Sequence, residues 1–143
     1  MKKVMALTIA GLMLSSVAYA SQQADLLSTW VNDKKLSLKD IVQKAEAFDN
    51  KTNNPHEGIT CISKDALGYN ILVHPNPAKN KNAAAFTDEE NKVLAQVFAA
   101  VNGKQRTEAV PVSYTVNQLN KEGTAYLVEK DSFCMAYQVV AKK

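Results

Sequence analysis

Residues 123–141 read GTAYLVEKDSFCMAYQVVA, a pattern typical of two short strands that fold back on each other. With Lys130 and Asp131 as the turn, Glu129 faces Ser132 and the pairing alternates from there. One face then carries Thr124, Tyr126, Val128, Phe133, Met135, Tyr137 and Val139, and the other carries Ala125, Leu127, Cys134, Ala136 and Gln138. Because both faces are largely apolar, the hairpin is predicted to lie inside a sheet rather than at its edge.

The chain just before this hairpin predicts one more strand. In residues 110–117, VPVSYTVN, apolar and polar side chains alternate as they do in a half-buried strand. Pro111 has no N–H to donate to a neighbouring strand, so this end is expected at a sheet edge. Residues 118–122 are predicted to form a loop that leads into the hairpin at Gly123.

Apolar spacing and capping residues predict three helices. Residues 21–31 have the apolar spacing of a short amphipathic helix. Ser37, with Asp40 three residues later, is an N-cap for a helix over residues 38–49. Thr87 and Glu90 form a T-x-x-E capping box that begins the third helix, and Asn102-Gly103 ends it.

The middle of the chain predicts two strands between polar loops. Residues 49–57 are polar and rich in turn formers, so they are expected to be a loop. Residues 58–63 and 67–74 have the composition of strands joined around Lys64-Asp65-Ala66. The run 75–82, PNPAKNKN, cannot continue a strand and is predicted to be the longest exposed connection.

The first twenty residues have the three parts of a secretory signal peptide. Lys2 and Lys3 precede an uncharged apolar run, which ends in Ala18-Tyr19-Ala20. We expect cleavage before Ser21, which leaves residues 21–143 as one exported domain in the periplasm or outside the cell, with no stable membrane insertion. An uncleaved N-terminal anchor is the alternative.

Composition excludes one class of partner and predicts one covalent crosslink. Arg106 is the only arginine and there is no basic stripe, so nucleic acid is not an expected partner. Cys61 and Cys134 are the only cysteines, and in an exported chain of this size they predict one disulfide. Two cysteines are too few for a structural zinc site without histidine ligands.

The predicted order is helix, helix, strand, strand, helix, strand, strand, strand. A curved antiparallel sheet with helices packed on it accommodates this order, so the fold class is α+β with five strands and two to three helices. Within it, residues 68–77, GYNILVHPNP, followed by Lys79-Asn80 or Lys81-Asn82, resemble the second-strand signature of small periplasmic single Cache domains. Residues 112–114, VSY, resemble the third strand of that family, and residues 126–130, YLVEK, with Phe133 resemble its closing hairpin.

The resemblance covers roughly residues 38–140 and implies a PAS-like sensor domain. It also implies that the first and last strands lie side by side, which would bring Cys61 next to Cys134. The chain departs from the family where Ala109 and Val110 stand in place of a common tryptophan, and it lacks the usual lysine ahead of Tyr126.

His56 and His74 are the only histidines, and with Glu57 nearby they could form a metal site or an acid–base pair. A turn through residues 64–66 would place His56 opposite His74, whereas a two-residue turn would separate them. Since both lie at predicted strand ends, where exposed histidine is common, we predict no metal, no cofactor and no catalytic residue. No G-x-S-x-G elbow and no glycine-rich phosphate loop is present.

The face opposite the cysteines is the candidate binding site. Its predicted ligand-binding side chains are His74, Tyr114, Tyr126, Met135 and Tyr137. An apolar wall with a few polar tips is typical of a pocket, although a fully packed core is the alternative.

The predicted function is therefore a non-catalytic, sensor-type protein that binds a small metabolite between the sheet and the loop 75–82. Without a membrane anchor it would need a separate protein partner, such as a membrane protein, to signal. The alternative is a protein-binding or inhibitor module that acts through its Asn- and Lys-rich loops. The oligomeric state does not follow from the sequence.

Overall fold

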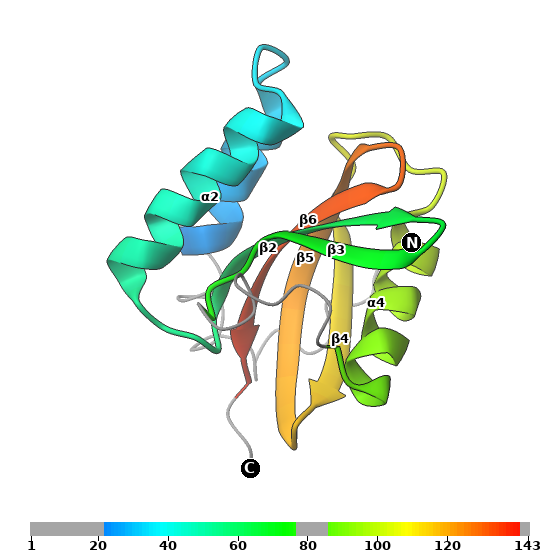
Figure 1. Ribbon diagram of the computed structural model, residues 1–143. Coiled ribbons are helices and arrows are strands. Elements are labelled where there is room, and N and C mark those ends of the chain that lie inside the picture. Colours follow the sequence, from blue (N-terminus) through cyan, green and yellow to red (C-terminus); the bar gives the residue numbers. More distant parts are fainter. Residues whose placement is uncertain (1–21, 77–85, 141–143) are drawn as a thin grey trace, which may run out of the picture.

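The computed structural model describes residues 22–76 and 86–140, which form a five-stranded antiparallel sheet with helices on both faces (Figure 1). The elements are a helix over residues 22–32, α2 (Leu38–Thr52), β2 (Gly58–Asp65), β3 (Gly68–Val73), α4 (Asp88–Val101), β4 (Val110–Val116), β5 (Leu119–Glu129) and β6 (Ser132–Val139). The α+β class and the predicted order of elements are confirmed.

The strands lie in the order β3-β2-β6-β5-β4, and every neighbouring pair is antiparallel. The last strand, β6, is therefore central, and it is buried along almost its whole length. This confirms the internal position expected from its apolar character on both faces. The edge position expected for Pro111 is also confirmed, because β4 is an edge strand.

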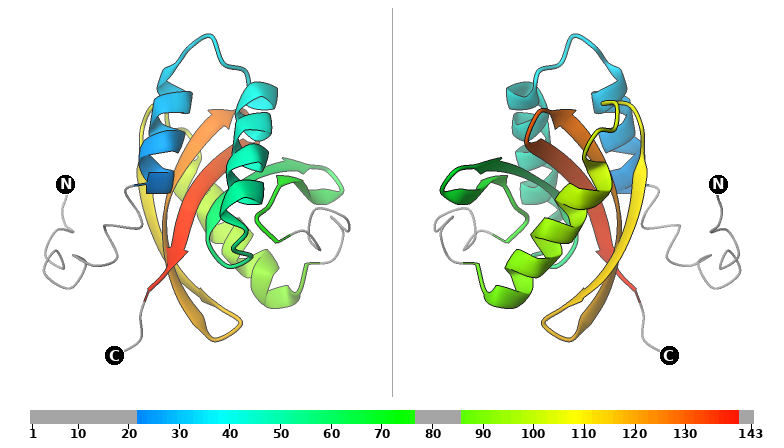
Figure 2. Two further views of the ribbon diagram at one scale, coloured as in Figure 1. Left: turned by 90° about the vertical axis from the view of Figure 1, so that its left-hand side faces the viewer. Right: turned by 90° about the vertical axis from the view of Figure 1, so that its right-hand side faces the viewer.

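Helices cover the two faces of the sheet unequally (Figure 2). The helix over residues 22–32 and α2 lie together on one face, where Leu27, Val31 and Ile41 pack over the strands. On the other face α4 packs Leu94, Val97 and Phe98 against residues of β6. The N-cap at Ser37 of α2 and the capping box at Thr87 of α4 are present as predicted, and Ser37 also forms a capping box with Asp40.

The predicted disulfide between Cys61 and Cys134 is present and buried. Both cysteines have no exposed surface. They are direct cross-strand partners on β2 and β6, so the bond joins the first and last strands at the middle of the sheet. It lies on the face covered by α2.

The predicted loop over residues 118–122 is wrong, because these residues belong to β5. The turn is Asn117-Gln118, and both residues are left-handed, with φ of 53° and 67°. Such a two-residue turn matches the twist of a hairpin, but it normally carries glycine. Since no glycine marks it, the turn was missed and β5 was predicted to begin at Gly123 rather than at Leu119.

The predicted pairing of the last hairpin is correct at its turn and wrong beyond it. Glu129 does face Ser132, but the register shifts between Leu127 and Glu129, so Val128 is an extra residue in β5. Tyr126 consequently pairs with Cys134 and is buried on the disulfide face. The prediction that Tyr126 shares a face with Met135 and Tyr137 is therefore wrong.

The turn between β2 and β3 settles the arrangement of the histidines. Asp65 pairs with Gly68, which leaves a two-residue turn at Ala66-Leu67. Cys61 pairs with Val73, so His74 lies near Thr60 and not opposite His56, which is exposed in the turn before β2. No group of three or more metal-ligating side chains occurs in the described part of the chain.

Two predictions fall on residues outside the described ranges. The predicted signal peptide covers residues 1–20, and most of the predicted loop 75–82 lies beyond Asn76. Among the helices of residues 22–76 and 86–140, none is long and apolar enough to cross a membrane.

Candidate functional site

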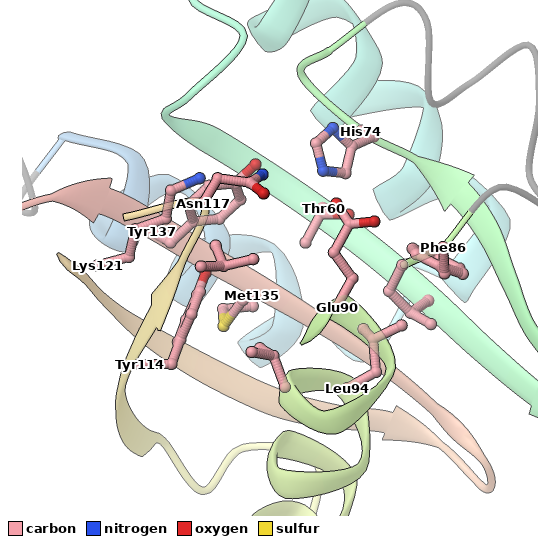
Figure 3. A pocket seen from close by; sticks show the side chains of 13 residues that line it. Thr60, His74, Phe86, Glu90, Leu94, Tyr114, Asn117, Lys121, Met135 and Tyr137 are labelled. Atoms are coloured by element: carbon pink, nitrogen blue, oxygen red, sulfur yellow. The ribbon is translucent and has the colours of Figure 1, made fainter. Parts of the chain in front are cut away.

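A pocket of about 90 Å³ lies between the N-terminal half of α4 and the sheet (Figure 3). It is on the face opposite the disulfide. Side chains from every strand except β3, from α4 and from the segments that flank them line it: Thr60, Ile62, His74, Phe86, Glu90, Val93, Leu94, Tyr114, Val116, Asn117, Lys121, Met135 and Tyr137. Its wall is mainly apolar with a few polar groups, as in most sites for small molecules.

Strand pairing explains how distant residues reach this pocket. Met135 and Tyr137 alternate along β6 and so point to the same face. Tyr114 of β4 is the direct partner of Lys121 on β5, which brings a phenol and an amine together at one end of the sheet. Figure 3 shows Tyr114 extending from β4 toward the centre of the pocket.

The absence of a side chain at Gly123 leaves room for the floor of the pocket. Gly123 pairs with Tyr137 across β5 and β6. A Cβ atom there would lie 2.8 Å from the carbonyl oxygen of Ala136 and 3.0 Å from both Met135 Cγ and Tyr137 Cβ. A larger residue would therefore displace Met135 and Tyr137.

Tyr137 contributes a hydroxyl group with an unmet hydrogen bond. The side chain is 2% exposed, and its Oη has no hydrogen-bond partner among the described residues. Burial raises the pKa of this phenol well above its usual value, with smaller contributions from Tyr114, Asp49 and Glu57. The group is therefore a protonated donor at any physiological pH, and an acceptor placed beside it would relieve a desolvation cost.

Lys121 is the cation of the pocket and lies against an aromatic ring. Its Nζ is 5.0 Å from the centroid of the Tyr137 ring, within the range of a cation–π contact. Burial lowers the pKa of this amine, while the carboxylates of Glu90 and Glu57 act in the opposite direction. The charged amine is thus balanced by nearby carboxylates rather than by water alone.

Tyr114 supplies a second phenol, and burial raises the pKa of this group as well. His74 and Thr60 form the opposite side of the pocket. The Nδ1 atom of His74 accepts a hydrogen bond from the backbone N–H of Asn76 at 2.9 Å. The hydroxyl of Thr60 donates to the carbonyl of Val73 at 2.8 Å, which holds the end of β3 against β2.

The start of α4 closes the remaining side of the pocket. Glu90 accepts the backbone N–H of Thr87 at 2.9 Å as part of the capping box, and its carboxylate lies near His74 in Figure 3. Next to it, Glu89 accepts the backbone N–H of Asn117 at 3.0 Å. This bond ties the β4–β5 turn to the helix and so holds Asn117 at the pocket.

The structure brings four of the five predicted ligand-binding residues together: His74, Tyr114, Met135 and Tyr137 line the pocket, and Tyr126 does not. Lys121 was not among the predicted site residues, because residues 118–122 were predicted to form a loop. Strand alternation counted from the Asn117-Gln118 turn would have identified it. Glu90 was explained by helix capping, which is also one of its roles here.

The pocket can bind and orient a small molecule, but its described groups are not arranged as a nucleophile with a general base. The cysteines are oxidised, and the two phenols are held in their protonated form. No family model, no curated protein and no solved structure matches this chain.

Proposed function

We propose that the chain is an exported, PAS-like domain that binds a small metabolite and catalyses no reaction. The observation that carries the proposal is the mainly apolar pocket under α4, which is lined by Tyr137, a residue whose buried hydroxyl has no hydrogen-bond partner among the described residues. A buried hydroxyl without a partner costs free energy, and a ligand that accepts its hydrogen bond recovers that cost.

The arrangement of the strands supports the family part of the proposal. In sequence order the sheet runs second, first, fifth, fourth and third strand, so the first strand lies beside the last. This is the neighbourhood that the resemblance to single Cache domains implies. The buried disulfide supports export, because such bonds persist in oxidising compartments.

A sensor of this kind passes its signal to another protein. We propose that the domain acts with a separate partner, such as a membrane protein that reads the ligand-bound state. The protein-binding alternative needs no pocket, so binding of a small molecule in the pocket would distinguish the metabolite-binding proposal from this alternative.

The test is a thermal-shift screen of small metabolites on the oxidised protein, followed by Tyr137→Phe. We expect this variant to be more thermally stable than the parent without ligand, because it removes an unpaired buried hydroxyl. It should also bind the ligand about fivefold to tenfold more weakly. Tyr126→Phe is the matched control, since Tyr126 is equally buried but lies on the disulfide face.

Two results would count against the proposal. One is a screen without any stabilising metabolite. The other is a ligand whose affinity is the same for the parent and for Tyr137→Phe. Either would favour the module that acts through its loops.

A further inference from the structure

The outer side of β4 pairs with no other strand of the described sheet. β4, drawn in yellow in Figure 2, lies at the outside of the sheet. Its Ser113 and Thr115 are exposed. Two hollows, of about 190 Å³ and about 300 Å³, adjoin the strand, and both are lined by Ser113 and Tyr114. The free edge is therefore open at the middle of β4.

The pairing with β5 fixes which backbone groups point to this free edge. In a hairpin with a two-residue turn, the residues that flank the turn exchange both hydrogen bonds, and every second pair beyond them does the same. Val116 and Leu119 flank the Asn117-Gln118 turn. Every second residue of β4 counted from Val116 thus bonds to β5. Ser113 and Thr115 lie between these residues, so their N–H and C=O groups point away from β5.

A hydrogen bond on the other side of β5 agrees with this alternation. Asn120 is the cross-strand partner of Thr115, and its carbonyl accepts the N–H of Val140 at 2.7 Å. This carbonyl therefore points toward the end of β6 and away from β4. The N–H and C=O groups of Thr115 consequently face the free edge.

The two edges of the sheet differ in how well they can accept another strand. β3 has an extra residue, Leu72, where its register against β2 shifts. Such a bulge interrupts the row of donors and acceptors along an edge strand. β4 pairs with β5 without a register shift and carries no charged side chain, and its one proline, Pro111, lies near its start.

The middle of β4 is complementary to a second copy of itself. In an antiparallel pair with a twofold axis at Tyr114, Ser113 of each copy faces Thr115 of the other, so the outward N–H groups of both residues meet outward carbonyls. The Ser113 hydroxyl can then donate to Thr115 Oγ1 of the second copy, which itself donates to Asn120 Oδ1 at 2.7 Å. Pro111 falls outside the paired segment, so its missing N–H is not needed.

We propose that β4 is a dimer interface, at which two copies of this chain join their sheets edge to edge through residues 112–116. The partner is a second copy because Ser113 and Thr115 supply both halves of the cross-strand hydrogen bond, and because uncharged strands meet without repulsion. The pairing brings the Tyr114 residues of the two copies opposite each other, so the pockets that they line adjoin the interface.

Sedimentation equilibrium of the purified, oxidised protein, from micromolar to millimolar concentration, tests this proposal. We expect the parent to approach twice the mass of one chain. Ser113→Pro and Ser113→Ala form a matched pair, since both remove the hydroxyl but only proline removes the outward N–H. The proline variant should associate about thirtyfold more weakly than the alanine variant, because symmetry removes two backbone hydrogen bonds from the interface.

Ser113→Lys gives a second readout that does not depend on proline. A lysine on this edge of both copies disfavours pairing, so we expect a monomer at concentrations where the parent is dimeric. Adding Thr115→Glu places a carboxylate of each copy opposite the lysine of the other. This double variant should therefore recover the dimer at low ionic strength.

Each outcome decides for or against the proposal. A parent that stays monomeric at millimolar concentration overturns it and favours a strand from another protein at this edge. A dimer of unchanged affinity in Ser113→Lys places the interface elsewhere and also overturns it. No recovery in the double variant contradicts the pairing of Ser113 with Thr115. Circular dichroism checks that the variants are folded, and if Ser113→Pro is not, the lysine variants decide.

Discussion

Asp49 is a carboxyl group that the fold removes from water without satisfying both of its oxygens. Its Oδ1 atom accepts the backbone N–H of Ile59 at 3.0 Å, while Oδ2 has no partner among the described residues. Burial raises the pKa of Asp49 from 3.8 to about 7, although the hydrogen bond from Ile59 acts in the opposite direction. The protonated form is therefore favoured in the folded protein.

Because the pKa of Asp49 is raised in the folded protein, we expect the free energy of unfolding to fall as the pH rises. The stabilising contribution of protonated Asp49 is fully present below pH 4, where this carboxyl is protonated in both the folded and the unfolded state. This contribution is lost as the pH rises to about 7. The loss should be on the order of 2 kcal/mol after allowance for solvent screening. Asp49→Asn should flatten this part of the pH profile and raise stability at pH 8, as measured by urea unfolding at each pH.

Asp65 provides a control of opposite sign. The side chain of Asn70 and the backbone N–H groups of Leu67 and Gly68 lower the pKa of this exposed carboxyl. Its stabilising effect is present at neutral pH and lost as the pH falls through the lowered pKa. Asp65→Asn should therefore lower the free energy of unfolding at pH 7. A profile for Asp49→Asn that runs parallel to the parent would contradict the assignment to Asp49.

At the scale of elements, Arg106 in the α4–β4 connection forms hydrogen bonds to the end of the helix over residues 22–32 and the turn after it. The guanidinium of Arg106, between α4 and β4, donates to the carbonyls of Val31 and Leu36 at 2.8 Å each and of Asp33 at 3.1 Å. These carbonyls lie at the end of the helix over residues 22–32 and in the turn after it, where helix carbonyls lack partners of their own. The planar fork of donors suits this role better than a single amine does.

Arg106→Lys is expected to cost about 2 kcal/mol of unfolding free energy, because a lysine cannot serve several carbonyls at once. Urea unfolding at pH 7 measures this. Lys104→Ala is the matched control, since its ion pair with Glu108 is exposed and should contribute less than about 1 kcal/mol. Equal losses in the two variants would show that the fork geometry of Arg106 is unimportant.

The β4–β5 turn predicts a gain in stability. Gln118 has a φ of 67°, a conformation that is costly for any residue with a Cβ atom. Gln118→Gly should therefore stabilise the protein by about 1 kcal/mol in urea unfolding, despite the added freedom of the unfolded chain. Asn117→Gly should gain less, because asparagine tolerates this conformation. A loss of stability in Gln118→Gly would mean that the Gln118 side chain makes a contact that stabilises the fold by more than the strain at this φ costs.

The Asn117-Gln118 turn and the extra residue Val128 in β5 are two features that the sequence could not predict. Helices and most strands followed from apolar spacing and capping residues, which are local. The Asn117-Gln118 turn lacks glycine, and the extra residue Val128 has no local signature at all. Both depend on how the strand fits its neighbours, so they displaced Lys121 and Tyr126 from their true positions in the prediction.

At the scale of the whole molecule, the disulfide joins residues that are 73 positions apart. Closing a loop of this length reduces the freedom of the unfolded chain, which predicts a loss of about 4 kcal/mol in the double variant Cys61→Ala/Cys134→Ala. Because both sulfurs are buried, the native protein should also resist reduction. Thiol titration after a short exposure to dithiothreitol should detect no thiols without denaturant and two per chain with it; rapid release from the native state would contradict this.

Export predicts the mass of the mature protein. If residues 1–20 are a signal peptide, intact-mass analysis of the protein recovered from the periplasm or the medium should give a chain that begins at Ser21. Recovery of the full-length chain in the membrane fraction would contradict this prediction.

The fastening of the helix over residues 22–32 also has a consequence for the order of folding. Besides the Arg106 contacts with Val31, the side-chain amide of Gln23 donates to the carbonyl of Tyr137. These partners lie 75 and 114 positions later in the chain. During synthesis the helix therefore emerges together with α2, which lies beside it, but long before these two partners. The contact with β6 can form only once Tyr137 has been made, so the helix reaches its final position on the sheet at the end of synthesis or after it.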